Sequence, residues 1–436
     1  MKESEDSASV SEATKQAGEV RARWAWAEPT IWTDRMLATL EGGIRGGKWF
    51  SLCDKAFSLK SLQAAYAKVK ARDGSAGVDG ITLGRFERDL DSNLARMHRE
   101  LMEGTYRPQS VRRVWIPKPG SSEKRPLGIP TVRDRVVQAA IKAALEPIFE
   151  KEFRDGSFGF RPGRSCHKAL SRVYRGLRQG RQYVVDADVR KFFDTIPHEI
   201  IMRGLESRVS DGKLLSVVRL YLSQGVIDEQ TWQTEGTPQG SVISPLLANI
   251  ALHGLDVLAE GRSLDLVRYA DDFVALCASR EDAESALEEI SAWLEGQGLS
   301  LHPEKTRIVN PGEPFDFLGF TFSRGKFFPR KKSIQNLRDS VRDKTGRLVG
   351  KSLQAIVLTL NPVLRGWFQY FKACTEYQFA MQDKFVRRRL RAILDRRIGK
   401  RPAYQGATTQ RWPNAYFERA GLFSMAKAKR ELANPL

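Results

Sequence analysis

Two adjacent carboxylates interrupt one of the most apolar parts of the chain. The segment LDLVRYADDFVALCAS, residues 264–279, consists of two apolar β-prone runs joined by a turn at 270–272. This pattern predicts a β-hairpin with Asp271 and Asp272 at its tip. Aspartate is a common turn former, so two in one tip are more often structural than catalytic. Strands this apolar, however, belong at the centre of a sheet, where neighbouring carboxylates repel each other and require cations.

A third carboxylate ends another apolar strand. The segment RQYVVDADVRKFFDTI, residues 181–196, runs from an apolar strand into Asp186 and Asp188. If this strand neighbours the hairpin, Asp188, Asp271 and Asp272 converge. Three such carboxylates are the ligand set for two divalent cations about 3.5–4 Å apart, which activate an attacking hydroxyl and stabilise a leaving phosphate oxygen. Because the ligands are oxygens only, Mg²⁺ is the expected metal.

The surrounding sequence predicts an α+β domain. Residues 111–130 contain two β-rich runs around a Pro/Gly/Ser tip, which predicts a second hairpin with Lys118 and Arg125 on its two arms. Residues 235–252 are interpreted as a Gly/Pro loop that opens into an apolar helix. Helical spacing follows both hairpins, over 131–150 and 281–294. This alternation favours a sheet covered by helices on one face.

The first 50 residues are expected to form an N-terminal extension. Residues 1–20 are rich in Ser, Ala and Glu with almost no large apolar side chains, which predicts disorder. Residues 21–50 contain four of the nine tryptophans and are expected to pack as a helical extension. From 51 to about 103 the spacing is mostly helical.

The positive charge is concentrated at the C-terminal end. The 436 residues carry 71 Lys and Arg against 52 Asp and Glu, a net charge of +19. Residues 321–436 hold 26 of these cations and 7 of the acids, so they contain the whole excess. This asymmetry indicates a polyanionic partner, with nucleic acid preferred. No run of 18 or more apolar residues exists, and no membrane partner is expected.

Two amphipathic helices are expected in this basic region. One begins at NPVLRGWFQYFK, with Asn361 as the N-cap and Pro362 at the first helical position. The other contains DKFVRRRLRAILDRRIGK, residues 383–400, and has an apolar back. Four cations share its opposite face: Lys384, Arg387, Arg388 and Arg391.

The cysteines and histidines exclude several classes of protein. The four cysteines are dispersed without a Cys-x-x-Cys pair, and the five histidines are equally scattered. Neither a disulfide framework nor a zinc module is expected, and a reducing intracellular setting is the default.

Taken together, these segments resemble a known family. YADD, residues 269–272, resembles the signature turn of reverse transcriptases, and Asp188 with Phe193 five residues later resembles their first palm motif. The combination with RPLGIPTVRDRVVQAA, SFGFRPGRSCHKAL, PQGSVISPLLANIAL and GLSLHPEKTRIV is specific. Order and spacing are similar to those of the group II intron-encoded reverse transcriptases, or maturases. The resemblance runs from about residue 55 to 425.

The resemblance implies a right-hand polymerase. Fingers and palm, with an antiparallel sheet and helices, would occupy 51–325, and an all-helical basic thumb and X domain would occupy 326–436. The implied activity is RNA-directed DNA synthesis from dNTPs with two Mg²⁺ ions, for which Mn²⁺ could substitute. The implied partners are an RNA template, a DNA primer or target, and intron RNA, whose splicing and mobility the X domain assists. The implied location is cytoplasmic, nucleoid-associated during action.

The resemblance also assigns metal and nucleic acid ligands by position. The metal ligands would be Asp188, Asp271, Asp272 and the backbone carbonyl of Val189. Arg161 and Arg164 would contact the template backbone. Cationic helices with aromatic residues suit RNA binding, and about six neutralised phosphates would give a log–log salt slope of roughly −4 to −5.

Further positions would form the nucleotide pocket. Phe193 would lie under the sugar, where a 2′-hydroxyl clashes, and Gln239 would border the pocket and template. Lys118 and Arg125 would close over the triphosphate. Lys305, in HPEKTR, would be a candidate general acid near the leaving pyrophosphate.

These pocket residues also have structural interpretations. Phe193 can be a core aromatic, although Phe192 is the better candidate for that role. Lys118 and Arg125 can be a solvated hairpin face, and Lys305 a surface lysine. FDFLGF, residues 315–320, resembles a primer-gripping hairpin.

Two other functions stay open at this point. Many relatives carry an HNH endonuclease with paired cysteines after the X domain, and no such residues follow here, so second-strand cleavage is not expected. One alternative is a splicing factor that binds RNA without needing its polymerase site. The other is a domesticated relative serving phage defence, CRISPR adaptation or repair.

Overall fold

The protein was analysed as a computed structural model that describes residues 18–117, 124–223, 226–227, 232–233, 240–346, 350–400 and 407–433. The disorder expected for residues 1–20 therefore falls almost wholly outside the described residues. The chain forms two compact units, which meet in the sequence at Asn310 and Pro311. The sequence-based boundary at 325 assigned most of residues 311–329 to the first domain, whereas their contacts group them with the second unit.

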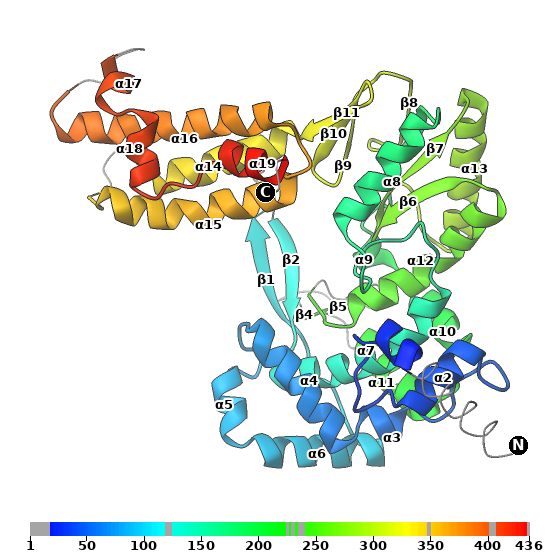
Figure 1. Cartoon of the computed structure of the whole chain (residues 1–436). Helices are drawn as coiled ribbons and strands as arrows, with labels where there is room; N and C mark the ends of the chain where they lie inside the picture. The colour runs from blue at the N-terminus through cyan, green and yellow to red at the C-terminus, as the bar shows by residue number, and fades with distance from the viewer. Residues whose placement is uncertain are drawn as a thin grey trace, which may run out of the picture. The chain divides into compact units, whose positions relative to one another are not determined.

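The first unit is built around a four-stranded antiparallel sheet (Figure 1). Its strand order is β6-β7-β3-β8. The strands are β3 (Tyr183–Asp188), β6 (Asp265–Tyr269), β7 (Asp272–Cys277) and β8 (Arg307–Val309). The predicted hairpin is therefore present as β6 and β7, and the 181–188 strand lies directly beside it.

The sheet has helices against both faces. On β7, Phe273 and Ala275 point into the main core, where α12 and α13 pack. Leu276 points to the other face and meets Gly176 of α8. The expectation of a single covered face is therefore wrong, because the small Gly176 allows α8 to approach the strands closely.

Helices make up most of the rest of the first unit. Those before the sheet are α2 (Asp34–Gly42), α3 (Cys53–Ala56), α4 (Leu59–Arg72), α5 (Leu83–Arg88), α6 (Leu90–Glu103) and α7 (Val132–Glu152). Those that follow are α8 (Cys166–Arg178), α9 (Phe192–Thr195), α10 (His198–Glu206), α11 (Gly212–Ser223), α12 (Ser244–Gly261) and α13 (Arg280–Gly296). The predicted helices after both hairpins are α7 and α13.

Helix α7 shows why the sequence folds locally as predicted. The Thr131 side chain accepts a hydrogen bond from Asp134 N and caps the helix. The buried residues recur at helical spacing: Val136, Ala140, Ala144 and Ile148. The N-terminal extension joins the same core, since Trp32 is fully buried and its indole N–H donates to the Ala143 carbonyl at 3.0 Å.

Two short hairpins lie outside the central sheet. The predicted one consists of β1 (Arg112–Pro117) and β2 (Lys124–Ile129), with Arg125 opposite Ile116. The second pairs β4 (Val226–Ile227) with β5 (Trp232–Gln233). In the described parts of the chain, no helix is long and apolar enough to cross a bilayer.

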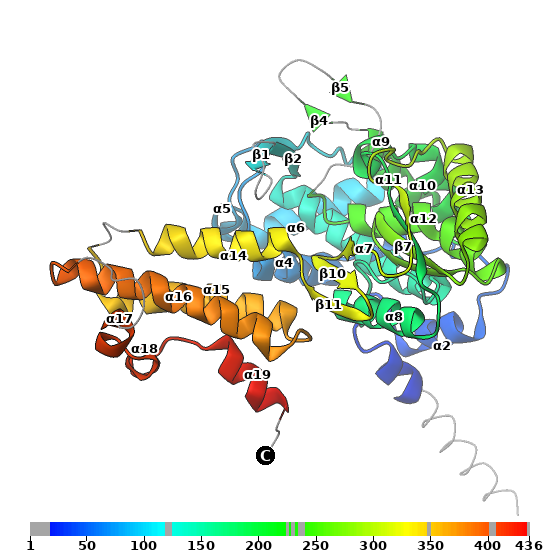
Figure 2. The same ribbon diagram turned by 90° about the horizontal axis from the view of Figure 1, so that it is seen from above.

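The second unit starts with a three-stranded sheet and continues as helices. The strands are β9 (Phe315–Phe317), β10 (Phe320–Ser323) and β11 (Lys326–Pro329). FDFLGF forms the β9–β10 hairpin, whose turn residues Leu318 and Gly319 both have positive φ, as a type I′ turn requires. The helices are α14 (Lys331–Lys344), α15 (Leu353–Phe371), α16 (Glu376–Arg397), α17 (Ala407–Arg411), α18 (Asn414–Arg419) and α19 (Met425–Ala433). Helix α14 packs against both α15 and α16 (Figure 2).

Helix α15 begins earlier than the sequence pattern suggested. Ser352 caps it by accepting from Ala355 N, and Asn361 and Pro362 lie in its interior. The prediction of Asn361 as an N-cap was wrong because its side chain has another partner. The amide bridges to the segment after α18, donating to the Gly421 carbonyl and accepting from Phe423 N, both at 2.8 Å.

Candidate active site

Two of the three carboxylates predicted as metal ligands lie directly opposite each other. The β3–β7 register pairs Asp188 with Asp272, and Asp271 occupies the turn that precedes β7. Because side chains alternate along a strand, Asp188 and Asp272 point away from the core-facing residues Ala187 and Phe273. The two inner strands thus bring Asp188 and Asp272 together at one end of the sheet, on one face.

The β6–β7 turn is a tight left-handed one. Ala270 has φ 61°, a region in which a side chain is disfavoured. The backbone of Gly159 lies against this turn so closely that a Cβ atom there would stand 2.4 Å from Ala270 N. The SFGF segment, residues 157–160, therefore supports the turn from behind and requires glycine at 159.

Electrostatics at the turn favour an incoming cation. Burial raises the pKa of Asp271, and the nearby Asp188 carboxylate adds to this effect. Lys305 offsets part of this negative charge, because its Nζ donates to Asp188 Oδ2 at 2.5 Å. A divalent cation bound beside two neighbouring carboxylates would relieve the repulsion between them.

The segment that carries Lys305 is tied to the end of β3. His302 N donates to the Asp188 carbonyl at 2.8 Å, and Val189 forms an antiparallel bridge with Leu301. The backbone on both sides of Asp188 is therefore ordered by residues 300–302. This connection explains why HPEKTR reaches the carboxylates although it is distant in sequence.

The donor set fits divalent cations in its chemistry. It offers three carboxylates and the Val189 carbonyl, all hard oxygen ligands suited to Mg²⁺ or Mn²⁺. Within the described residues, however, no three His, Cys, Asp or Glu side chains are already grouped as a metal-binding cluster. Lys305 is bound to Asp188 in this arrangement, and a cation would have to take over that interaction.

Phe193 and Phe192 have different environments. Phe192 is 1% exposed and belongs to the core, whereas Phe193 is only partly buried. Their rings meet edge to face with centroids 5.6 Å apart. Phe192 is thus the packing residue, and Phe193 keeps an accessible side, as its predicted role requires.

The remaining nucleotide-pocket predictions fall partly outside the described residues. Lys118 and Gln239 both lie outside the described residues. Arg125 is exposed on β2. The end of the Pro-Gln-Gly loop packs on the same strand, because a Cβ on Gly240 would stand 2.5 Å from the Gly128 carbonyl oxygen.

Sequence reasoning missed a residue that holds this loop. Gln138 of α7 accepts hydrogen bonds through Oε1 from Ser241 Oγ at 2.7 Å and from Val242 N at 2.9 Å. Its side chain is buried with the apolar face of α7. A glutamine at a helical core position was the available signal, since buried amides need partners.

Arg161 does not contact a template backbone in this fold. Its guanidinium donates to both Glu150 carboxylate oxygens at 2.9 Å and to the Arg154 and Ser157 carbonyls, and its side chain is 2% exposed. The prediction was wrong because these acceptors use the cation internally. Arg164 is more accessible and donates to Asp155 at 2.6 Å, which lowers the pKa of that carboxyl group.

The predicted cationic face of α16 is only half present. Lys384 and Arg388 are exposed, whereas Arg391 is 9% exposed and donates to the Trp412 carbonyl and to Asn414. Burial, with a smaller effect of Arg387, lowers the pKa of Arg391. Arg391 was assigned wrongly, because helical spacing does not reveal that residues 412–414 cover this side of α16.

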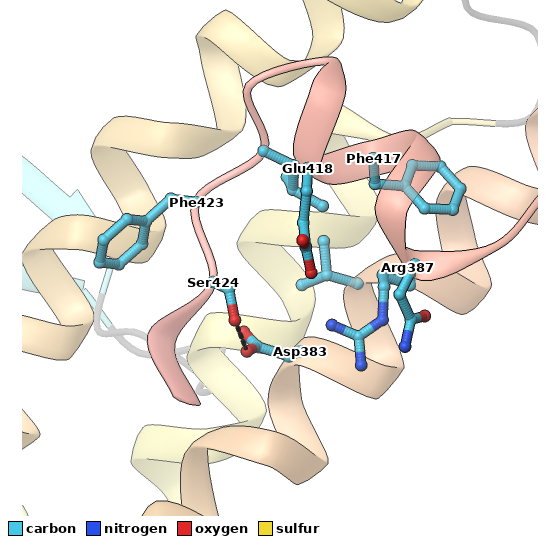
Figure 3. Close-up of a pocket in the computed structure, with 9 residues that line it drawn as sticks. Asp383, Arg387, Phe417, Glu418, Phe423 and Ser424 are labelled. Carbon is cyan, nitrogen blue, oxygen red and sulfur yellow. Dashed lines mark hydrogen bonds between the residues drawn. The ribbon is translucent and has the colours of Figure 1, made fainter. Parts of the chain in front are cut away.

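Arg387 has an intermediate position. It lines a small pocket with Asp383, Phe417 and Ser424, and Figure 3 shows the pocket between α16 and the 414–424 segment. Its Nε atom is buried and has no hydrogen-bond partner among the residues that the structure describes. Arg387 therefore contributes less to the outer surface than Lys384 or Arg388.

Two family models match the chain. Residues 116–322 match "Reverse transcriptase (RNA-dependent DNA polymerase)", and residues 334–412 match "Group II intron, maturase-specific domain". The first match contains the carboxylate site and the second contains most of α14–α16. Neither match is an endonuclease domain.

Similar curated proteins extend these matches. Protein YkfC of Escherichia coli is 33% identical over 70% of this chain and 86% of its own length. Group II intron-encoded protein LtrA of Lactococcus lactis is 30% identical over 69% of this chain, which spans 59% of LtrA. A chain of a partial Cas6-RT-Cas1–Cas2 complex is 24% identical, with 57% of this chain and 43% of that chain covered, at a TM-score of 0.36.

The fold and the site thus define a right-hand polymerase of the reverse transcriptase class, with a helical C-terminal region. The chain belongs to the reverse transcriptases that carry a group II intron maturase-specific domain. Reverse transcriptases generally use divalent metal ions, and this family acts on RNA and other nucleic acids.

Proposed function

We propose that this protein copies RNA into DNA from dNTPs with Mg²⁺, and that it also binds intron RNA to assist splicing and mobility. The observation that carries the proposal is the β3–β7 register, which sets Asp188 opposite Asp272 beside the Asp271 turn. The match to the maturase-specific domain supports the role in splicing. The sequence similarity of the chain to LtrA supports both the polymerase role and the splicing role.

The metal ligands in this proposal are Asp188, Asp271, Asp272 and the Val189 carbonyl. Two bound cations would activate the primer hydroxyl and neutralise charge on the leaving phosphate oxygens. The chain's own contribution is to hold Asp188 and Asp272 opposite each other and to keep Asp271 partly withdrawn from water.

Lys305 has a defined part in this proposal. Its Nζ donates a hydrogen bond to Asp188, and the 300–302 contacts hold its segment at the site. With a cation held by Asp188, the ammonium group would be available to the leaving pyrophosphate as a proton donor. The partly exposed Phe193 supports exclusion of a 2′-hydroxyl, and the exposed Arg125 supports contact with the triphosphate.

The basic second unit supports RNA binding. Residues 321–436, which make up most of this unit, hold the whole net charge excess, and Lys384 and Arg388 of α16 are open to solvent. Exposed Tyr377 and Met381 lie on the same helix at the spacing of one face. Cations interleaved with an aromatic ring suit phosphate contacts combined with base stacking.

The test is primer extension on a homopolymer RNA template with a DNA primer, dNTPs and Mg²⁺, beside a splicing assay with a group II intron RNA. Extension in the first assay and faster splicing in the second are the expected results. Splicing without extension by the wild-type chain would replace the polymerase proposal with that of an RNA-binding splicing factor.

A further inference from the structure

A buried arginine lies immediately before the candidate active site. Arg268, on β6, is fully buried, and its position three residues before Asp271 has no part in the roles assigned above. A fully buried charged side chain is costly unless all its hydrogen-bonding groups are satisfied. The hydrogen-bond partners of Arg268 therefore indicate which part of the structure its burial stabilises.

All five N–H donors of Arg268 have acceptors within hydrogen-bond distance. Nε and Nη2 donate to the two carboxylate oxygens of Asp256, at 2.8 and 2.5 Å, and Asp256 is itself buried. Nη2 also donates to Ser157 Oγ at 2.8 Å. Nη1 donates to Asn249 Oδ1 at 3.1 Å and to the Ala270 carbonyl at 2.9 Å. A guanidinium group has no further donor to offer.

The bond to Ala270 is the informative one. Ala270 is the left-handed residue of the turn, and this conformation is disfavoured for a residue with a Cβ atom. The bond from Arg268 fixes the carbonyl that precedes Asp271. The conformation of Ala270 sets the direction in which the next two residues, Asp271 and Asp272, leave the turn.

The other partners anchor Arg268 to rigid parts of the first unit. Asp256 and Asn249 lie on α12, and Asn249 Nδ2 also donates to the Gly159 carbonyl at 2.8 Å. The backbone of β6 pairs with the 156–158 segment, since Arg268 N donates to the Gly156 carbonyl and Phe158 N donates to the Arg268 carbonyl, both at 2.8 Å. One side chain thus connects the turn to a helix and to the loop that supports the turn from behind.

We infer that Arg268 is a positioning residue for the polymerase reaction, which acts by holding Ala270 in its left-handed conformation and so placing Asp271 and Asp272. The inference rests on the proposed function of these carboxylates. Asp256 and Asn249 orient Arg268, and none of the three touches substrate. Supporting residues of this kind typically affect metal affinity or activity by about 10–100-fold.

The test replaces the buried ion pair without leaving a lone charge. The double variant Arg268→Met with Asp256→Leu substitutes apolar side chains for both partners, an exchange that folded proteins often tolerate. A fall in kcat of about 10–100-fold is expected, with little change in KM for the dNTP. Asp211→Ala is the matched control: it removes a buried carboxylate that binds the Leu52, Cys53 and Leu214 amides, distant in sequence from the turn, and its kcat should stay at the wild-type value.

A second substitution separates positioning from loss of fold. Glycine adopts the left-handed conformation without steric cost, so adding Ala270→Gly to the double variant should raise kcat again. Amide hydrogen exchange on the metal-free protein gives a readout independent of activity. Faster exchange in the 265–277 peptide alone is expected for the double variant.

Two results would overturn the inference. One is a uniform rise in exchange over the first unit with no recovery by Ala270→Gly, which would make Arg268 an ordinary stabilising residue. The other is unchanged kcat and unchanged exchange in the double variant. A wild-type chain that fails to extend primers would instead remove the proposed function, and the exchange measurement would still decide whether Arg268 orders the turn.

Discussion

Lys305 donates to Asp188 with 2.5 Å between the ammonium nitrogen and the carboxylate oxygen, although 117 positions separate them in the chain. The contact joins a predicted proton donor to a predicted metal ligand. Lys305 thus places an internal cation beside the Asp188 carboxylate. If Asp188 binds a divalent cation as proposed, that cation would compete with Lys305 for the same carboxylate.

Substitution of Lys305 by Met should separate these two effects. Because the ion pair is partly exposed, the free energy of unfolding should change by no more than about 1 kcal/mol. Binding of Mn²⁺, measured by isothermal titration calorimetry, should become tighter because the competitor is gone. The rate of nucleotide addition should nevertheless fall by about 10²–10⁴-fold if Lys305 is the general acid. Weaker metal binding in Lys305→Met would contradict the competition.

The double substitution Asp271→Asn with Asp272→Asn should abolish primer extension. It removes two carboxylate ligands while keeping side-chain size, so the fold and the basic second unit should be unaffected. Binding of a labelled intron RNA, measured by filter retention, should stay within about twofold of wild type. Undiminished extension by this variant would show that the metal assignment is wrong.

Phe193→Ala should admit ribonucleotides. The larger pocket removes the proposed clash with a 2′-hydroxyl, so the ratio of kcat/KM for dNTP over rNTP should fall. Phe192→Ala is the matched control, because that ring is buried in the core. It should cost about 3–5 kcal/mol of stability and leave the discrimination of the folded fraction unchanged. If Phe193→Ala discriminates as well as wild type, Phe193 is a packing residue.

Neutralising Lys384 and Arg388 together should weaken RNA binding in a salt-dependent way. Both side chains are exposed, and loss of two phosphate contacts reduces the log–log salt slope by about 1.4–1.8. Affinity should be measured over a range of KCl concentrations. Arg391→Lys, at a buried position, should lower thermal stability and leave the slope unaltered. An unaltered slope in the Lys384/Arg388 variant would place the RNA interface elsewhere.

Asp211 should make the first unit sensitive to acid. Burial opposes its ionisation, but the amides of Leu214, Leu52 and Cys53 donate to the carboxylate and hold its pKa below the ordinary value. A depressed pKa contributes stability above the unfolded-state value of about 3.9, and this contribution is lost as pH falls through the folded-state pKa. Asp211→Ala should therefore cost about 1–2 kcal/mol at pH 7, and the difference from wild type should shrink below about pH 4. Urea unfolding at both pH values measures it, and a constant difference would contradict the assignment.

Local sequence was sufficient to predict a helix or hairpin wherever periodicity and turn chemistry act within one segment. The β6–β7 and β1–β2 hairpins, α7, α13 and the apolar back of α16 all follow from alternation, helical spacing and caps. Asn361 shows the limit of such rules. Cap chemistry depends on what the side chain bonds to, and here that partner, the 421–423 segment, lies 60 residues away.

The site residues likewise divide into those that the local sequence identifies and those whose role depends on distant partners. Asp188, Asp271 and Asp272 stand out because carboxylates at the ends of apolar strands contradict the burial preferences around them. Arg161 and Arg391 carry the same charge as Arg388, and nothing in their own segments marks them as buried. Only folding brings Glu150 to Arg161 and residues 412–414 to Arg391. Arg268 did carry a signal, as a cation inside an apolar strand, but its partners on α12 were not predictable.

The amino-acid sequence by itself determined which residue types stand at the ends of the apolar strands, and that the excess charge lies after residue 320. Both depend on composition and spacing, which need no neighbour. Tertiary structure decided which cations are free to meet RNA, which one neutralises Asp188, and which one orders the turn before Asp271. A charge is defined by its chemistry, but its availability is set by the acceptors that folding brings within hydrogen-bond distance.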